Sequence, residues 1–285
     1  MKFAHSFWSK PLYNCKFDKF EESLKNILSN YTLSLLLLHT HHESVTLYTD
    51  KKGAELLSFL PYDNVVIIDG LDNESIHFAA QIKFEALKRM DLGDVLIDGD
   101  LFLRSQEVIN IIKDSKEDVI CSFFEPYQFT LENPINRRKC VALSKLLTNI
   151  VDFDVPSNFK DFEWMNTSLM KFNNKQLLDE YIRRYEYNKQ QCSNIDFKYT
   201  WPDIILEQHF LTLLVKDKYS FKYIIENYFF DPNTNQKALD LGYTHLGMYK
   251  NQYYNWVMDK IKEINSKYYK KILKLCTTIK IQEQN

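Results

Sequence analysis

Asp98-Gly99-Asp100 is the segment of this chain most suited to metal chemistry. It follows the apolar residues Val95–Ile97 and precedes Leu101–Leu103, a pattern typical of a strand buried on both faces. Two carboxylates at the end of such a strand are costly to bury unless a positive group lies between them. Glycine permits a sharp turn, so both side chains can converge on a hard divalent cation that bridges to phosphate oxygens. The alternative is an ordinary Asp-Gly turn.

A second segment, HLGMYK, contains His245, Gly247 and Lys250. A neutral imidazole is a common metal ligand, and an ammonium group pairs with phosphate oxygens. Alone, His245 is more typical of a structural or exposed histidine. Together with the two aspartates, it becomes a candidate third ligand of the same metal.

The composition limits the class of protein. The chain has 285 residues, of which 45% are hydrophobic and 26% charged, as in ordinary globular proteins. Its net charge of −2 gives no electrostatic reason to expect nucleic acid as a partner. The chain has six glycines and contains neither GxGxxG nor GxxxxGK[ST]. A bound diphosphate would therefore have to be neutralised by a metal and by side chains.

The expected location is the cytoplasm. Five cysteines are scattered without a CxxC pair, which is typical of reduced thiols. No signal peptide is recognisable, and the apolar run Leu35–Leu38 is far shorter than the ~20 residues of a membrane span.

Strand-like and helix-like patterns alternate along the first half of the chain, which predicts an α/β fold with a central, mostly parallel mixed sheet flanked by helices. The expected strands are Lys2–Trp8, Val45–Tyr48, Asn64–Ile68, Val95–Leu103, Asp118–Ser122 and Glu163–Phe172. The expected helices are Phe17–Leu28 with Tyr31–His42, Gly53–Leu60, Ser75–Met90, Gln106–Ile112, Arg138–Ile150, Gln176–Lys189, Pro202–Leu214 and a long C-terminal helix. Ligands of such sheets bind beyond the carboxyl ends of the strands, where Asp50, Asp69 and Asp98 are expected.

An ordered set of segments gives the chain a family resemblance. These segments are FWSKPL, LYTDKKGAELL, LPYDNVV, VLIDGDLFL, EWMNTSLMKFNN, ILEQHFL and THLGMYK. Together they resemble GT-A fold glycosyltransferases, the metal-dependent class that uses nucleotide sugars. The plan is similar to glycogenin and to bacterial lipooligosaccharide galactosyltransferases. It is more similar to an uncharacterised bacterial group encoded near surface-polysaccharide genes. The resemblance implies a catalytic domain at residues 1–250 and a C-terminal helix and tail at residues 251–285.

The resemblance implies a role for each residue of the metal site. Asp98, Asp100 and His245 would hold Mn²⁺ or Mg²⁺ on the diphosphate of the donor, with Gly247 and Lys250 near the phosphates. One departure matters, because these families usually have two residues between the histidine and the glycine, and here only one stands there. This departure leaves the phosphate contacts and the assignment to a retaining family open.

Other residues are implied to contact the rest of the donor. Asp50 would lie near the base or ribose, and Lys83 near the donor sugar or phosphate. Asn166 would contact the transferred sugar, while Glu207 and Gln208 would lie beneath the anomeric carbon. Glu207 would act as a base in an inverting route. Gln208 or Glu207 would stabilise the cationic sugar in a retaining route.

The implied function is hexosyl transfer from a nucleotide-diphosphate sugar, UDP-linked, to a glycan or glycolipid acceptor. One alternative is a nucleotidyltransferase-like enzyme, which also gathers carboxylates around a metal. Such an enzyme normally has a glycine-rich loop near its first strand, and none is present here. The other alternative is a non-catalytic nucleotide-sugar-binding protein of the same fold.

The C-terminal segment is rich in lysine. Seven lysines and the pair Tyr268-Tyr269 lie between Asp259 and Lys280. Such a composition suits peripheral contact with the inner face of a membrane, where lysines meet anionic headgroups. The alternative is a solvated helix face. The sequence gives no indication of the oligomeric state.

Overall fold

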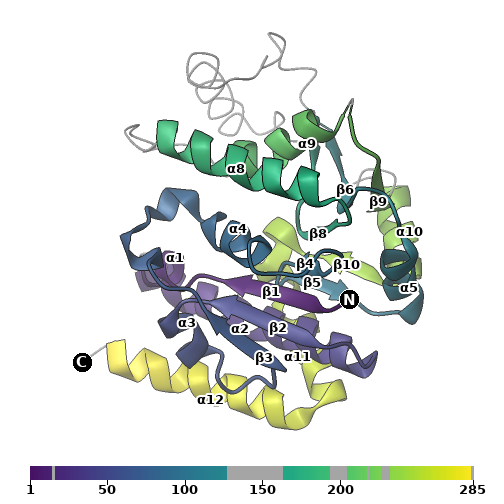
Figure 1. Ribbon diagram of the computed structural model, residues 1–285. Helices are drawn as coiled ribbons and strands as arrows, with labels where there is room; N and C mark the ends of the chain where they lie inside the picture. Colours follow the sequence, from purple (N-terminus) through teal and green to yellow (C-terminus); the bar gives the residue numbers. More distant parts are fainter. Residues whose placement is uncertain (15–16, 127–162, 193–203, 217, 226–231, 284–285) are drawn as a thin grey trace.

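The computed structural model describes residues 1–14, 17–126, 163–192, 204–216, 218–225 and 232–283 (Figure 1). The expected helix at 138–150 lies outside these residues. Within the described part of the chain, no helix combines the length and the apolar character needed to cross a membrane.

A mixed sheet of eight strands forms the centre of the molecule. In spatial order its main path runs through β3 (Asn64–Ile67), β2 (Val45–Thr49), β1 (Phe3–Phe7), β4 (Val95–Ile97), β8 (Leu169–Phe172), β6 (Val119–Pro126) and β7 (Glu163–Met165), and β9 (Phe221–Ile225) pairs with β6. The first four strands are parallel, β8 is antiparallel to both of its neighbours, and β9 is parallel to β6. A separate two-stranded antiparallel sheet joins β5 (Leu101–Leu103) to β10 (Tyr243–His245).

Helices cover both faces of the large sheet (Figure 1). They are α1 (Lys10–Tyr13), α2 (Phe17–Thr40), α3 (Lys51–Leu56), α4 (Gln81–Leu87), α5 (Gln106–Asp114), α8 (Lys175–Cys192), α9 (Phe210–Val215), α10 (Pro232–Leu241), α11 (Lys250–Ile264) and α12 (Ser266–Glu283). Short 3₁₀ turns occur at η1 (Leu71–Asn73), η2 (Ile76–Phe78) and η5 (Gly247–Tyr249), and a π-helix, η4, spans Ile204–His209. The predicted fold class is confirmed: a mostly parallel mixed sheet flanked by helices.

Strand β1 shows why the sheet is buried on both faces. Its residues Phe3 and Phe7 belong to a hydrophobic cluster with α2, α11 and α12. Ala4 and the following Trp8 belong to a second cluster on the other face, with α4, α8 and α9. Alternate side chains of a strand point to opposite faces, so a strand covered on both sides is buried throughout; in β1 this includes the polar side chains of His5 and Ser6.

Two expected strands are wrong in extent, because each is interrupted by a turn. Residues 95–103 form β4 and β5, which belong to different sheets and are separated by Asp98-Gly99-Asp100. Residues 163–172 form β7 and β8, separated by Asn166–Ser168. In that turn Ser168 N donates to Asn166 Oδ1 at 3.0 Å. Such local side-chain bonds to the backbone compete with the strand ladder.

Two expected helices are also shorter than predicted. Residues 75–90 begin as the 3₁₀ turn η2 and become α-helical at α4. The C-terminal helix is divided into α11 and α12 at Asn265, whose backbone is extended with φ −158°. Asn265 Oδ1 accepts a hydrogen bond from Lys267 N at 3.1 Å, so this asparagine starts the second helix as it ends the first.

Candidate metal centre

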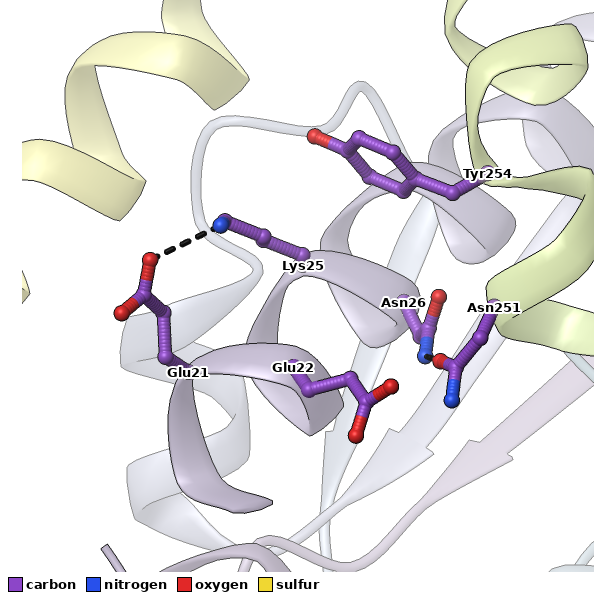
Figure 2. Close-up of a pocket in the computed structure, with 6 residues that line it drawn as sticks. All are labelled: Glu21, Glu22, Lys25, Asn26, Asn251 and Tyr254. Carbon is purple, nitrogen blue, oxygen red and sulfur yellow. Dashed lines mark hydrogen bonds and ion pairs between the residues drawn. The ribbon is translucent and has the colours of Figure 1, made fainter. Parts of the chain in front are cut away.

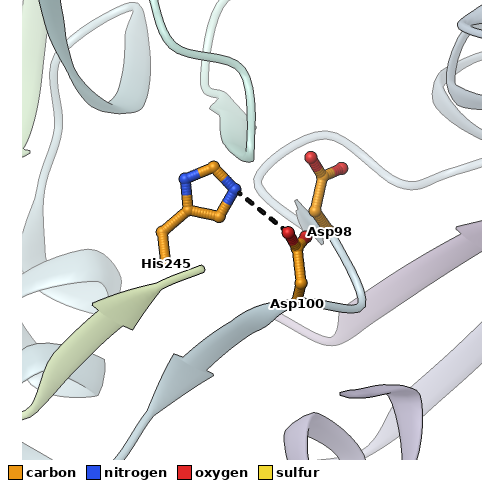
Figure 3. A group of neighbouring side chains, drawn as sticks. All are labelled: Asp98, Asp100 and His245. Carbon is orange, nitrogen blue, oxygen red and sulfur yellow. Dashed lines mark ion pairs between the residues drawn. The ribbon is translucent and has the colours of Figure 1, made fainter. Parts of the chain in front are cut away.

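Two aspartates and a histidine from distant parts of the chain meet at one point (Figure 3). One potential ligand atom from each of Asp98, Asp100 and His245 lies within 4.8 Å of the other two. The aspartates lie in the turn between β4 and β5, and His245 ends β10. Because β10 pairs with β5 so that His245 is opposite Leu101, the pairing of the small sheet brings the imidazole to the turn.

The turn depends on the glycine between the aspartates. A Cβ atom at Gly99 would lie 2.4 to 2.6 Å from three ring atoms of Tyr31, closer than any side chain tolerates. The ring is fixed in turn, because Tyr31 Oη donates to Ser6 O at 2.6 Å. Asp98 N also donates to Ser168 O at 2.7 Å, which joins this turn to the turn between β7 and β8. Gly99 does not have a positive φ, so aromatic packing from α2 explains the glycine at this position.

Asp100 is buried and surrounded by positive groups and donors. Its Oδ2 atom lies 3.1 Å from Lys250 Nζ, accepts from Gly247 N at 3.1 Å and lies 3.6 Å from His245 Nε2. Burial alone would raise the pKa of Asp100, but the neighbouring Lys250 and His245 lower it below its usual value. In the same pair, the negative charge of Asp100 raises the pKa of Lys250. Both groups are therefore charged at neutral pH.

Asp98 is linked to a second lysine. Lys83 Nζ lies 2.8 Å from Asp98 Oδ1 and 2.8 Å from Glu207 Oε1, and the lysine side chain is 15% exposed. Burial would lower the pKa of Lys83, but the two carboxylates outweigh it and raise that pKa above its usual value. Lys83 is thus an ammonium that joins the aspartate turn to Glu207.

Glu207 is held at one oxygen by two donors. Lys83 Nζ and Thr167 Oγ1, the latter at 2.5 Å, both bind Oε1. The glutamate lies in the π-helix Ile204–His209, a local geometry that is frequent at functional sites. Tyr181 Oη donates to the carbonyl of Glu207 at 2.9 Å and fixes this part of the backbone. The sequence analysis missed Thr167, because a hydroxyl within an expected strand gives no sign of this contact.

The charges and donor atoms of the cluster fit a divalent cation. Three carboxylates face two ammonium groups, which leaves one net negative charge when the imidazole is neutral. Carboxylate oxygens suit Mg²⁺ and Mn²⁺, and the imidazole nitrogen favours the transition metal of the two. Adding a doubly charged cation would make the cluster positive, which is what a diphosphate needs.

Contacts link seven of the ten predicted site residues into this one cluster: Lys83, Asp98, Asp100, Glu207, His245, Gly247 and Lys250. The described contacts of the other three lead elsewhere. Asp50 accepts from Ser9 N at 3.0 Å and from Ser9 Oγ at 2.5 Å. Asn166 accepts from Ser168 within its turn. Gln208 Oε1 is buried and finds no hydrogen-bond partner among the described residues.

A separate pocket of about 400 Å³ lies between α2 and α11 (Figure 2). Six residues line it: Glu21, Glu22, Lys25, Asn26, Asn251 and Tyr254. Its polar groups already bind one another, because Lys25 pairs with Glu21 at 2.8 Å and Asn26 with Asn251. None of the predicted site residues lines this pocket, so it is distinct from the metal centre.

Comparison with solved structures finds distant similarities. The galactosyltransferase LgtC, in complex with donor and acceptor sugar analogues, has 10% identity, 86% coverage of both chains and a TM-score of 0.45. GlyE of Streptococcus pneumoniae TIGR4 has 10% identity, 89% coverage of this chain, 51% of its own and a TM-score of 0.37. Mouse xyloside xylosyltransferase 1 has 12% identity, 67% and 71% coverage and a TM-score of 0.32. At TM-scores below 0.5, these similarities carry no argument about activity.

Comparison of sequences gives a clearer result at the level of family. No curated protein matches the chain. One family model, described as a family of unknown function, matches residues 1–275. This chain therefore belongs to the family DUF6734.

Proposed function

We propose that this chain is a metal-dependent glycosyltransferase. It would transfer a hexose from a nucleotide-diphosphate sugar, UDP-linked, to a glycan or lipid-linked glycan acceptor. The observation that carries this proposal is the meeting of Asp98, Asp100 and His245 beside the Lys83–Glu207 pair. A cation site next to a carboxylate and two lysines suits the separation of a sugar from a diphosphate.

The first half of the reaction is the departure of the diphosphate. Asp98, Asp100 and His245 would hold Mn²⁺ or Mg²⁺, which supplies a Lewis acid for the phosphate oxygens when bound. Lys250 and Gly247 N both bind Asp100 Oδ2, and we infer that Lys250 would add an ammonium group to the same phosphate oxygens. Positive groups placed where negative charge develops lower the barrier to breaking the bond between the anomeric carbon and the phosphate oxygen.

The second half is the attack of the acceptor hydroxyl on the anomeric carbon. As a base, Glu207 would take the proton of that hydroxyl, and the product would be inverted. In a retaining route, Gln208 or Glu207 would stabilise the cationic sugar, and the hydroxyl would attack from the face that the diphosphate leaves. Its proton would pass to an oxygen of the departing phosphate. Asn166 and Gln208 would contact the transferred sugar, and Asp50 the base or ribose. The anomeric configuration of the product, measured by NMR, distinguishes the two routes.

The proposal assigns the chemistry to residues 1–250 and a different role to residues 251–285. In α12 the side chains of Ile272 and Cys276 face the core, so the exposed lysines are left on the outer side. These are Lys267, Lys270, Lys271 and Lys274 of α12, and Lys262 near the end of α11 is exposed as well. Each contributes on the order of 1 kcal/mol at an anionic surface. We infer a cytoplasmic enzyme of surface-polysaccharide synthesis that binds anionic vesicles at low salt and leaves them at high salt.

Calorimetry with UDP, with and without Mn²⁺, tests the central proposal. We expect UDP to bind more tightly when Mn²⁺ is present, and we expect slow hydrolysis of a UDP-sugar under the same conditions. Failure of UDP to bind under both conditions would contradict the proposal. Release of pyrophosphate from a nucleoside triphosphate and a sugar phosphate would instead identify a nucleotidyltransferase.

A further inference from the structure

Each of the two aspartates of the metal centre has a lysine ammonium bound to it. Lys83 Nζ lies 2.8 Å from Asp98 Oδ1, and Lys250 Nζ lies 3.1 Å from Asp100 Oδ2. We propose that Lys250 and the divalent cation compete for Asp100, and that the displaced ammonium binds the donor diphosphate. The cation and the nucleotide then bind cooperatively. This inference rests on the proposed function and specifies the order in which its ligands bind.

The competition follows from the lone pairs of one oxygen. A carboxylate oxygen accepts about two hydrogen bonds, and Asp100 Oδ2 already accepts from Gly247 N and from Lys250 Nζ. The same oxygen lies 3.6 Å from His245 Nε2, the imidazole nitrogen that would share the cation. A cation between these two atoms must replace the ammonium. It is also repelled by the ammonium as long as Lys250 stays in place.

The two lysines differ in what they can do after such a replacement. Lys83 is 15% exposed and keeps Glu207 as a second carboxylate partner when Asp98 turns to the cation. Lys250 is 44% exposed at the first turn of α11, and Asp100 is its ion-pair partner within the described chain. Lys250 is therefore the lysine that needs a new anion and has the freedom to reach one. The phosphates held by the same cation would be the nearest.

The exchange predicts opposite effects of one substitution on two ligands. In Lys250→Met, Mn²⁺ alone should bind about tenfold more tightly, because its competitor is gone, within the 5–150-fold typical of coupled sites. At saturating Mn²⁺ the same variant should bind UDP more weakly, because one partner of the phosphates is lost. If Lys250 only contacted phosphate, its substitution would weaken the binding of UDP and leave the affinity for Mn²⁺ alone unchanged.

Electron paramagnetic resonance of free Mn²⁺ measures the first affinity, and calorimetry with UDP measures the second. Lys260→Met is the matched control, because it removes the same charge from the same helix. Lys260 pairs with Glu263 at 2.7 Å and not with the aspartates. It should change neither affinity. Lys250→Gln, which keeps a polar side chain, should reproduce the effects of Lys250→Met and guards against a loss of folding.

The outcomes separate this inference from the function on which it rests. Tighter binding of Mn²⁺ alone by both Lys250 variants, with weaker binding of UDP, supports the exchange. Unchanged or weaker binding of Mn²⁺ alone overturns the exchange and leaves the metal centre in place. Failure of the unaltered protein to bind Mn²⁺, with or without UDP, overturns both the metal centre and the exchange.

Discussion

Two largely buried lysines of this protein differ in the groups that their ammonium nitrogens bind. Lys83 lies between the carboxylates of Asp98 and Glu207, and these raise its pKa. Lys171, on strand β8, is 4% exposed and binds backbone carbonyl groups. The first lysine belongs to a region with excess negative charge, and the second to a junction within the core. The comparison suggests that a lysine bound to carboxylates belongs to the candidate site, and that a lysine bound to backbone carbonyl groups stabilises the fold.

The surroundings of Lys171 explain its structural role. Its ammonium donates to the carbonyl oxygens of Ile112, Lys113 and Ser115 at 2.9, 3.2 and 3.0 Å. These groups end α5, where the last carbonyls lack partners within the helix and the helix dipole is negative. Burial lowers the pKa of Lys171, and the positive charge of Lys116 lowers it further. Lys171 therefore joins β8 to the end of α5, and its hydrogen bonds within the described residues all go to backbone carbonyl groups.

The largest expected effect is the loss of activity in Asp100→Asn. Removing one anionic metal ligand should reduce metal-dependent hydrolysis of a UDP-sugar at least about 100-fold. The free energy of unfolding should fall by only about 1–3 kcal/mol, because the amide keeps the shape of the side chain but loses the charge that pairs with Lys250. Activity assays and urea unfolding of the same sample measure both. Full activity in this variant would show that the Asp98-Gly99-Asp100 turn takes no part in the mechanism. The distinction between the charged site and the core around Lys171 would then lose its basis.

Lys171→Met should give the opposite result, with lower stability and unchanged catalysis. The carbonyl groups of Ile112 and Lys113 lose this donor, while Ser115 O still accepts from Asn173 Nδ2 at 3.1 Å. We therefore expect the free energy of unfolding to fall by about 2 kcal/mol. The kcat should remain within about twofold of the unaltered protein at a temperature where both are folded. Lys175→Met, at an exposed i,i+4 pair with Asp179, is the control and should cost about 0.5 kcal/mol or less. A loss of kcat without a loss of stability would contradict the structural role.

Gly99→Ala should lower both the stability of the protein and its affinity for Mn²⁺. The added methyl group meets the Tyr31 ring, and such overpacking costs about 1–3 kcal/mol. Displacement of the turn should also weaken the binding of Mn²⁺. The double variant Gly99→Ala with Tyr31→Leu removes the ring and should recover part of the affinity for Mn²⁺. No recovery would show that the backbone, and not the ring, requires glycine.

The last prediction concerns the pH dependence of stability, to which the buried side chain of His5 should contribute. His5 lies between Tyr62 Oη at 2.8 Å and Ser34 Oγ at 3.0 Å, and burial, with the charge of His39, lowers its pKa to about 3. Between about pH 6.5 and pH 3 the unfolded chain binds one proton more than the folded chain at this position. Stability therefore decreases as the pH falls through this range, by up to about 1.4 kcal/mol per pH unit.

Urea unfolding at several pH values between 4 and 7, compared with His5→Gln, measures that contribution. The variant lacks the titrating group, so its stability should depend less steeply on pH even if its absolute stability is lower. Equal slopes in the two proteins would show that His5 does not stay neutral in the folded state.

The sequence predicted those parts of the site that are local in the chain. The two aspartates follow an apolar strand, and His245, Gly247 and Lys250 fall within six residues, so pattern and resemblance were sufficient to propose them. The same holds for the order of most strands and helices. Periodicity did not show that Asp98-Gly99-Asp100 divides the expected strand, because apolar residues continue on both sides of the turn.

The contacts between the residues of the site could not be predicted from the sequence. Lys83 and Glu207 are 124 residues apart, and their pairing depends on how α4 and the π-helix dock on the sheet. Thr167 lay within an expected strand, where a hydroxyl has no special meaning. The ring of Tyr31 looked like one of many apolar positions of a long helix. Such contacts follow from the packing of elements, which no local pattern specifies.

The pairing of β10 with β5 also determines when the metal centre can exist. Gly247 and Asp100, which share a hydrogen bond, are 147 residues apart in the chain. A cation bound by Asp98, Asp100 and His245 is therefore a cross-link that closes a loop of more than half the chain, and such links are absent from the unfolded state. During synthesis both aspartates leave the ribosome long before the histidine. The newly made chain cannot bring the three candidate ligands together until His245 has been made, so loading of the proposed centre would follow the synthesis of residues 1–245.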